Sequence, residues 1–150
     1  MHVIFSLENV YLYGHCAGAF TESSPDRAHT RKGRVRAAMA RELLAASRRL
    51  PVVIARASVY FGPRGGAQSN LGDRVFGPAV RPAWRGGLAS VLGDPDQPHT
   101  YTFLPDIGES LAVLGEHPDA VGEIWHLPND PHTRTTRELV EIVYRLAGRA

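Results

Sequence analysis

The chain has 150 residues, of which 43% are hydrophobic and 21% are charged, and its formal net charge is +2. These values are typical of one globular domain and exclude a disordered chain. A charge this small does not by itself indicate a nucleic-acid partner. No apolar run approaches the roughly 20 residues that span a bilayer, and the first residues lack the charged and then apolar pattern of a signal peptide.

The chain contains a single cysteine, Cys16. One cysteine excludes an internal disulfide framework and is typical of a protein in a reducing compartment. We therefore expect a cytoplasmic protein that is not associated with a membrane.

Three short runs rich in β-branched and aromatic residues predict buried strands, namely "HVIFSL" at 2–7, "PVVIARA" at 51–57 and "EIWHLP" at 123–128. Between the first two, the spacing of the apolar residues predicts a helix over 33–47. Its apolar stripe is expected to consist of Val35, Met39, Leu43 and Ala46.

The same helical geometry turns the basic residues Arg34, Arg41 and Arg48 to the solvent and leaves Arg36 at the border of the stripe. Most of the basic cluster at the start of the helix is therefore interpreted as a solvated surface.

Five further elements are predicted after residue 68. A helix is expected over 69–80, ending near Gly77 and Pro78, and residues 88–94 and 99–104 are expected to form a strand pair around the turn "DPDQP". Residues 105–117 predict another helix, with Pro105 near its start. A last helix should begin with a capping box from Thr135 to Glu138 and end at Gly148.

Strands that alternate with helices indicate an α/β fold, in which the first two strands pair in parallel through the helical crossover. No internal repeat, low-complexity segment or linker divides the chain.

Several familiar kinds of site are absent from the sequence. The seven histidines include no His-x-x-x-His pair and there is no Cys-x-x-Cys, so no metal site is predicted. His126, inside an apolar strand, is interpreted as a core residue with satisfied hydrogen bonds. There is no Gly-x-Ser-x-Gly, and "GPRGG" at 62–66 lacks the pattern of a phosphate-binding loop, so it is interpreted as a flexible loop.

Seven motifs occur in a specific order along the chain. They are "VYLYG" at 10–14, "TESSP" at 21–25, "PVVIARASVYFGP" at 51–63, "SNL" at 69–71, "VLGDPDQPHTYTFLPD" at 91–106, "GEIWHLPND" at 122–130 and the closing helix. In this order the chain resembles the extended short-chain dehydrogenases/reductases, the NAD-dependent epimerases and dehydratases. The resemblance covers nearly the whole chain and begins at the fifth strand of the family's nucleotide-binding sheet.

The resemblance implies a partial Rossmann-like parallel sheet with a small substrate-binding subdomain. Residues 1–63 would be the remnant of the sheet, and residues 64–150 would lie mostly on the substrate side of one partial domain. The family's Gly-rich dinucleotide turn belongs to an N-terminal half that is absent from this sequence, so we expect either a truncated chain or a chain whose other half is supplied from elsewhere. The first strand is then expected to be an exposed edge that pairs with another chain or forms a homo-oligomer.

In the family, a serine and a tyrosine followed by glycine precede a Tyr-x-x-x-Lys pair on the next helix. There the tyrosine exchanges a proton with the substrate, and the lysine lowers the phenol pKa and holds the cofactor ribose. In this sequence Tyr13 and Gly14 match the Tyr-Gly step and Asn9 takes the serine's place, while Glu22 and Pro25 match the acidic residue and proline that follow.

Counting on from Glu22, the family's tyrosine and lysine positions fall on Gly33 and Ala37, which carry neither a proton nor a charge. The remaining catalytic candidates are Asn9, Tyr11 and Tyr13.

The resemblance also implies binding residues. Arg36 would replace the lysine in holding the ribose of NAD or NADP, and Ala57 and Ser58 would line the nicotinamide end. Asn70 and His99 would contact the diphosphate of a nucleotide-sugar. Asp106 matches an aspartate that opens the next helix, or is simply a charge that stabilises the helix N-terminus.

Two hypotheses follow. The first is an atypical NAD(P)-dependent epimerase/dehydratase acting on a nucleotide-sugar-like or related carbonyl or hydroxyl substrate. The alternative is a non-catalytic module that keeps the fold and binds a ligand or a partner. Nucleic-acid binding through the basic residues 27–49 is disfavoured, because no stacking aromatic residues lie among them.

Overall fold

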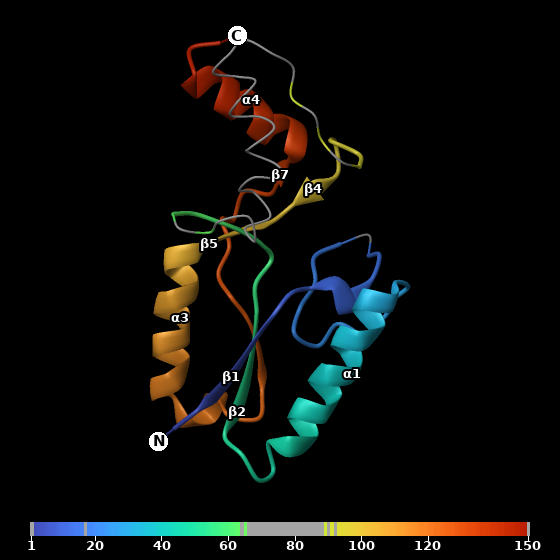
Figure 1. Ribbon diagram of the computed structural model, residues 1–150, viewed down its shortest axis with the longest axis vertical. Helices are drawn as coiled ribbons and strands as arrows, with labels where there is room; N and C mark the ends of the chain where they lie inside the picture. The colour runs from blue at the N-terminus through green and yellow to red at the C-terminus, as the bar shows by residue number, and fades with distance from the viewer. Residues whose placement is uncertain are drawn as a thin grey trace. The chain divides into compact units, whose positions relative to one another are not determined.

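The structure, a computed structural model, describes residues 2–16, 18–63, 65, 89, 91 and 93–149. The chain divides into two compact units (Figure 1). The first comprises Met1–Ser58 and Asp106–Pro128, and the second comprises Val59–Pro105 and Asn129–Ala150. The predicted division near residue 63 lies close to the first of these boundaries, and residues 106–128 return to the first unit.

The first unit contains a parallel three-stranded sheet in the order β1-β2-β6. Its strands are β1 (Ile4–Glu8), β2 (Val52–Arg56) and β6 (Ile124–His126), which lie where the three apolar runs predict strands. β1 and β2 pair from Ile4 opposite Val52 to Glu8 opposite Arg56. The predicted parallel pairing through a helical crossover is therefore confirmed.

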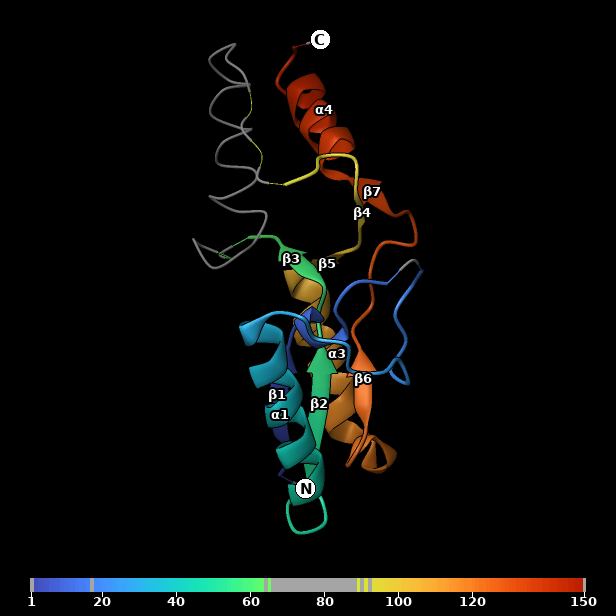
Figure 2. The ribbon, with the colours of Figure 1, turned by 90° about the vertical axis from the view of Figure 1, so that its right-hand side faces the viewer.

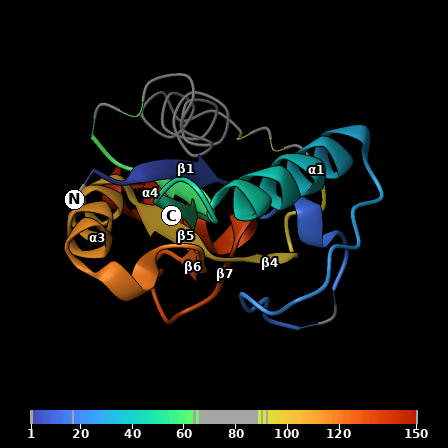
Figure 3. The same cartoon turned by 90° about the horizontal axis from the view of Figure 1, so that it is seen from below.

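Helices cover both faces of this sheet. Figure 2 and, seen from below, Figure 3 show α1 (Arg31–Ala46) on one side and α3 (Leu104–Glu116) on the other. β2 is buried along its whole length because it has a strand on either side and a helix over each face. Ala40, Val52 and Ile54 form a buried cluster between α1 and the sheet, and Leu43 and Leu44 pack against it.

The buried face of α1 differs from the predicted stripe. Val35 and Met39 are 52% and 41% exposed, whereas the buried residues of α1 are Gly33, Ala37 and Ala40. Small side chains let the helix approach its neighbours closely, and this contact outweighs the burial of the larger residues. The prediction was right for Arg34, Arg41 and Arg48, which are exposed.

The second unit contains two small sheets. β3 (Val59–Phe61) pairs in parallel with β5 (Tyr101–Phe103), and β4 (Pro98–His99) pairs antiparallel with β7 (Arg134–Thr135). The predicted pairing of 88–94 with 99–104 is wrong, because Ala89, Val91, Gly93 and Asp94 are not in a strand. Instead of forming a local hairpin, β5 pairs with β3 and β4 pairs with β7, and both of these partners are distant in sequence.

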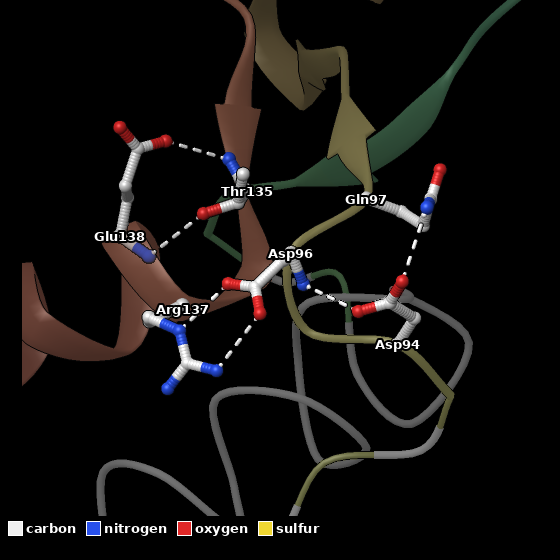
Figure 4. A network of polar contacts seen from close by, with 6 residues as sticks. All are labelled: Asp94, Asp96, Gln97, Thr135, Arg137 and Glu138. Carbon is white, nitrogen blue, oxygen red and sulfur yellow. Dashed lines mark hydrogen bonds and ion pairs between the residues drawn. The ribbon is translucent and has the colours of Figure 1, made fainter.

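The helix α4 (Thr136–Leu146) begins at the predicted capping box, in which Thr135 and Glu138 satisfy each other's backbone N–H groups. Gly148 follows with a φ of 70°, as expected after a helix end. Figure 4 shows how this helix is joined to the turn before β4. The Arg137 guanidinium donates to both carboxylate oxygens of Asp96, at 2.7 and 3.0 Å.

Three predictions fall wholly or partly outside the described residues, namely the helix at 69–80, part of the loop at 62–66 and part of the strand at 88–94. Within the part of the chain that the structure describes, none of the helices is both long enough and apolar enough to span a membrane.

Candidate functional site around Tyr13

The three strands of the first unit each end in a polar residue at the same edge of the sheet. The register places Glu8 opposite Arg56 and Arg56 opposite His126. Because parallel strands end together, these three side chains converge although they are far apart in sequence. Glu8 and Arg56 are buried, with 4% and 3% of their surface exposed, and His126 is half-buried.

Tyr13 lies over this edge at the end of a short 3-10 helix, η1 (Tyr11–Tyr13), and is only 1% exposed. Its hydroxyl accepts a hydrogen bond from an Arg56 terminal nitrogen at 2.6 Å and lies 2.7 Å from Nε2 of His126. Because the Tyr13 oxygen accepts a hydrogen bond from the guanidinium, its own proton is available to donate to the imidazole. We therefore assign Nε2 of His126 as the acceptor. One phenol thereby links two strand ends.

The pKa values agree with this assignment. Burial raises the pKa of the Tyr13 phenol, although the hydrogen bond and charge of Arg56 partly oppose the effect. Burial also lowers the pKa of His126. At neutral pH the phenol is therefore protonated and the imidazole is neutral, which is the state that this hydrogen bond requires.

The Arg56 charge is balanced by Glu8, whose Oε2 lies 3.3 Å from Nε of Arg56. The Glu8 side chain is 0% exposed and the Arg56 side chain is 3% exposed, so the pair is withdrawn from water. Removing one partner of such a pair leaves the other charge buried and unpaired, which is strongly destabilising. Because the pair lies at the strand ends, Glu8 balances the charge of the guanidinium that donates to the Tyr13 hydroxyl.

The loop between η1 and α1 closes over the same site. Glu22 accepts a hydrogen bond from the backbone N–H of His126 at 2.8 Å, and this bond holds the pKa of the Glu22 carboxyl below its usual value. Phe20 stacks on the ring of Tyr13 with a centroid distance of 4.8 Å. The acidic residue that the resemblance matched thus satisfies a backbone donor of the edge strand β6.

Gly14 is required by its backbone conformation. Its φ is 71°, and an added Cβ would collide with the carbonyl of Arg27. The N–H of Arg27 in turn donates to the carbonyl of Leu12 at 3.1 Å. The glycine therefore allows the loop to fold back against η1.

Positions 33 and 37 of α1 face η1. An added Cβ on Gly33 would lie 2.6 Å from the carbonyl oxygen of Tyr11 and 2.9 Å from Cβ of Ala28. Ala37 is 4% exposed and packs in a buried cluster with Leu12 and Tyr13. Close packing therefore fills the space in which a larger side chain at either position would have to lie.

Tyr11 and Asn9 lie at the surface end of the site. Tyr11 is 41% exposed, and Nζ of Lys32 lies 4.3 Å from the centre of its ring. The carboxamide oxygen of Asn9 accepts from the N–H of Tyr11 at 3.1 Å, which fixes the turn into η1. The structure thus brings Asn9, Tyr11 and Tyr13 together, with Tyr11 as the exposed phenol and Tyr13 as the buried one.

The predicted binding residues are more dispersed. Arg36 is half-buried in a shallow depression on α1, apart from the buried cluster, whereas Ala57 is buried and Ser58 half-buried at the end of β2. His99 is exposed on β4 in the second unit, and Asn70 lies outside the described residues. The depression is lined by Arg31, Lys32, Val35, Arg36 and Met39.

Glu8 and Arg56, which the sequence did not single out, form a buried ion pair beside Tyr13. Their signal was a charged residue at the end of each of two apolar strands, where burial demands a partner. His126 is hydrogen-bonded as predicted, but its partner is 113 residues away. Among the described residues, no group of three His, Cys, Asp or Glu side chains is arranged to hold a metal ion.

No protein-family model and no curated protein sequence matches the chain. Several solved structures do. A dTDP-glucose 4,6-dehydratase from Bacillus anthracis, in complex with NAD, has a TM-score of 0.83 and 22% identity over 97% of this chain and 46% of its own. A UDP-glucuronic acid 4-epimerase from Bacillus cereus, in complex with UDP-glucuronic acid and NAD, has a TM-score of 0.82 and 18% identity over 99% and 46% of the two chains.

RMD from Pseudomonas aeruginosa, complexed with NADPH, has a TM-score of 0.80 and 18% identity, and the match covers 99% of this chain and 50% of its own. The chain therefore spans about half the length of these proteins. At such identities the likeness is one of fold. It confirms the predicted α/β architecture with a parallel, Rossmann-like sheet.

Proposed function

We propose that the chain is the C-terminal half of an NAD(P)-dependent epimerase/dehydratase fold, that it acts on a nucleotide-sugar-like or related carbonyl or hydroxyl substrate, and that it lacks the family's tyrosine–lysine proton relay. The observation that carries this proposal is the fold, which follows a dTDP-glucose 4,6-dehydratase over 97% of the chain with a TM-score of 0.83. Association through the edge of β1 and a cytoplasmic location remain predictions.

The loss of the relay is supported by the packing of α1. A phenol at position 33 would need the space next to the Tyr11 carbonyl, and an ammonium at position 37 would be buried against Leu12 and Tyr13. A buried unpaired charge is strongly unfavourable. The residues around both positions are thus arranged for close contact rather than for catalysis.

NAD(P) is the proposed cofactor of the complete fold, because the matched dehydratase and RMD were crystallised with NAD and NADPH. The residues of this chain at positions 33 and 37 do not fit the nicotinamide ribose, since Ala37 has no polar group and is buried. Arg36 lies in the surface depression of α1 and does not replace that group in the cluster. We therefore derive no hydride-transfer step.

If the chain takes part in chemistry, Tyr11 is the phenol placed to exchange a proton with a ligand, because it is exposed. Tyr13 is buried and already shares its hydroxyl with Arg56 and His126, so its proposed part is to hold η1 in place. Asn9 positions Tyr11 through the hydrogen bond to its backbone N–H.

The second candidate function is a non-catalytic module that keeps the fold and binds a ligand or a partner. The burial of Ala37 and the tight contact at Gly33 favour it. It differs from the first in one measurable respect, since it predicts binding of a nucleotide-sugar without turnover.

Ligand binding is tested by isothermal titration of the full chain with dTDP-glucose and with UDP-glucuronic acid. We expect His99→Ala and Asn70→Ala to weaken the affinity about 3–10-fold, the loss typical of one or two polar contacts to a charged group. His132→Ala is the matched control, because His132 is also an exposed histidine of the second unit. Failure of both nucleotides to bind, or an equal loss in the control, would contradict the proposal.

Turnover is tested by following the nucleotide-sugar with NAD or NADP present, in the wild type and in Tyr11→Phe and Tyr13→Phe. Catalysis by Tyr11 predicts that Tyr11→Phe loses turnover while its ligand affinity is unchanged. Binding without turnover in the wild type supports the non-catalytic module. Unchanged turnover in Tyr11→Phe excludes Tyr11 as the proton donor.

A further inference from the structure

A groove in the first unit lies between α3 and β6, and we call it the α3–β6 groove. Its volume is about 470 Å³, within the range of small-molecule sites. Its lining includes Asp106, Glu109, Ser110, Val113, Trp125 and His126.

The helix presents two kinds of side chain to this groove. Asp106, Glu109 and Val113 are spaced by three and four residues, so they follow one another along one face of α3. The carboxylates of Asp106 and Glu109 lie toward the start of the helix, and Val113 lies further along with half of its surface exposed. One end of the groove is thus acidic and the other apolar.

The strand contributes an aromatic surface. Trp125 is 40% exposed, and its indole Nε1 donates to the carbonyl of Ala120 at 3.3 Å, so the ring is held in place. The face of an indole attracts cations, and an ordered ring offers this surface without a large loss of side-chain entropy.

The charges of the groove are unbalanced. Of the described residues that line it, two are carboxylic acids and none is lysine or arginine. Burial lowers the pKa of His126, so its imidazole does not offset them at neutral pH. A nucleotide diphosphate would be repelled here, whereas a ligand with a positive charge and an apolar body matches both ends of the groove.

We propose that the α3–β6 groove binds a small organic ammonium ion, whose apolar body lies against Trp125 and Val113 and whose nitrogen approaches Asp106 and Glu109. This site does not depend on the proposed nucleotide-sugar function. Because the expected ligand has the opposite charge, each proposal is tested with its own ligands and either one stands if the other fails.

The test uses three probes with the same aromatic body, namely benzylammonium, benzyl alcohol and benzoate, added to the full chain. Binding is followed through the indole N–H resonance of Trp125, which is assigned by its disappearance in Trp125→Phe because the chain has two tryptophans. We expect benzylammonium to shift this resonance saturably at millimolar concentration, as is usual for a ligand this small, and to bind more tightly than benzyl alcohol and benzoate.

The variants separate the two halves of the groove. The double change Asp106→Asn and Glu109→Gln should weaken benzylammonium binding about 3–10-fold at low salt, because it removes two partly exposed charge contacts. Trp125→Leu, followed through the backbone resonances of Ser110 and Val113, should weaken it by a similar factor through loss of the cation–π contact.

Glu116→Gln is the matched control, since Glu116 is an exposed acid on the same helix outside the groove. Circular dichroism of every variant checks that the fold is kept. The proposal is overturned if benzylammonium causes no saturable shift, if benzyl alcohol or benzoate binds equally well, or if Glu116→Gln weakens binding as much as the double change.

Discussion

At the scale of single residues, the site is held by polar groups that would be unfavourable alone. Arg56 is buried and shares its hydrogen bonds between the Glu8 carboxylate and the Tyr13 hydroxyl, and Tyr13 in turn satisfies His126. Each group can be accommodated in the interior because its neighbour supplies the hydrogen bond or the counter-charge that it needs. The last contact, from the Tyr13 hydroxyl to Nε2 of His126, requires a neutral imidazole.

The lowered pKa of His126 makes stability depend on pH. In the unfolded chain the imidazole takes up a proton near its usual pKa of 6.5, whereas in the folded protein it does so only at lower pH. Between these values the unfolded state binds more protons, so the free energy of unfolding falls as the pH drops below about 6.5. Urea unfolding at pH 7.5 and 5.5 should show this loss, and His126→Asn should reduce it.

His2→Ala serves as the comparison in that experiment, because His2 is exposed. Every histidine other than His2 and His126 is present in both variants, so their contributions cancel in the comparison. If the two variants lose stability to the same extent, the His126 imidazole is not the group responsible.

At the scale of elements, α1 is the part of the fold in which size matters more than hydrophobicity. The helix contacts η1 through Gly33 and Ala37, while the larger Val35 and Met39 face outward. Thr30 starts the helix by accepting from the N–H of Gly33 at 3.0 Å, so the glycine lies in the first turn. Its position is set by the cap, and its lack of a side chain is required by the contact with Tyr11.

The change Gly33→Ala should therefore destabilise the protein, although alanine is the better helix former. We expect the free energy of unfolding to fall by about 1–3 kcal/mol, the usual cost of overpacking. Gly108→Ala in α3 is the matched control, because its Cβ meets nothing within 4 Å. There we expect a gain of up to about 1 kcal/mol from helix propensity.

Both values come from urea denaturation followed by circular dichroism. Equal gains in the two variants would show that α1 moves away from η1 without cost. The space at position 33 would then be available to a larger side chain, and the packing of α1 would no longer support the loss of the relay.

At the scale of the whole molecule, charge is used differently in the two units. The first unit buries the Glu8–Arg56 pair, whereas the second joins α4 to the turn before β4 through the exposed pair of Asp96 and Arg137. Solvent screens the exposed pair, while the buried pair is complete only as long as both partners are present. The candidate site around Tyr13 thus depends on buried electrostatics in the first unit.

Glu8→Gln should cost about 3–5 kcal/mol of unfolding free energy, because it leaves the Arg56 charge buried without a counter-charge. Asp96→Asn, which also removes one carboxylate from an ion pair, should change the free energy little because the pair is exposed. Chemical denaturation of both variants measures the contrast. A small effect of Glu8→Gln would mean that water reaches Arg56.

Local pattern was sufficient to determine the strands β1, β2 and β6, the helices α1, α3 and α4, and the parallel crossover. Periodicity, caps and the length of the connection are properties of neighbouring residues, so they are present in the sequence itself. The same holds for the absence of a tyrosine and a lysine at positions 33 and 37.

Only the tertiary structure decided which face of α1 is buried and which groups meet at the edge of the sheet. An apolar stripe marks the large side chains, whereas close backbone approach selects the small ones, and the approach depends on the neighbouring element. Likewise, Glu8, Arg56 and His126 become partners through strand register, which joins residues 48 and 70 positions apart that no local pattern relates.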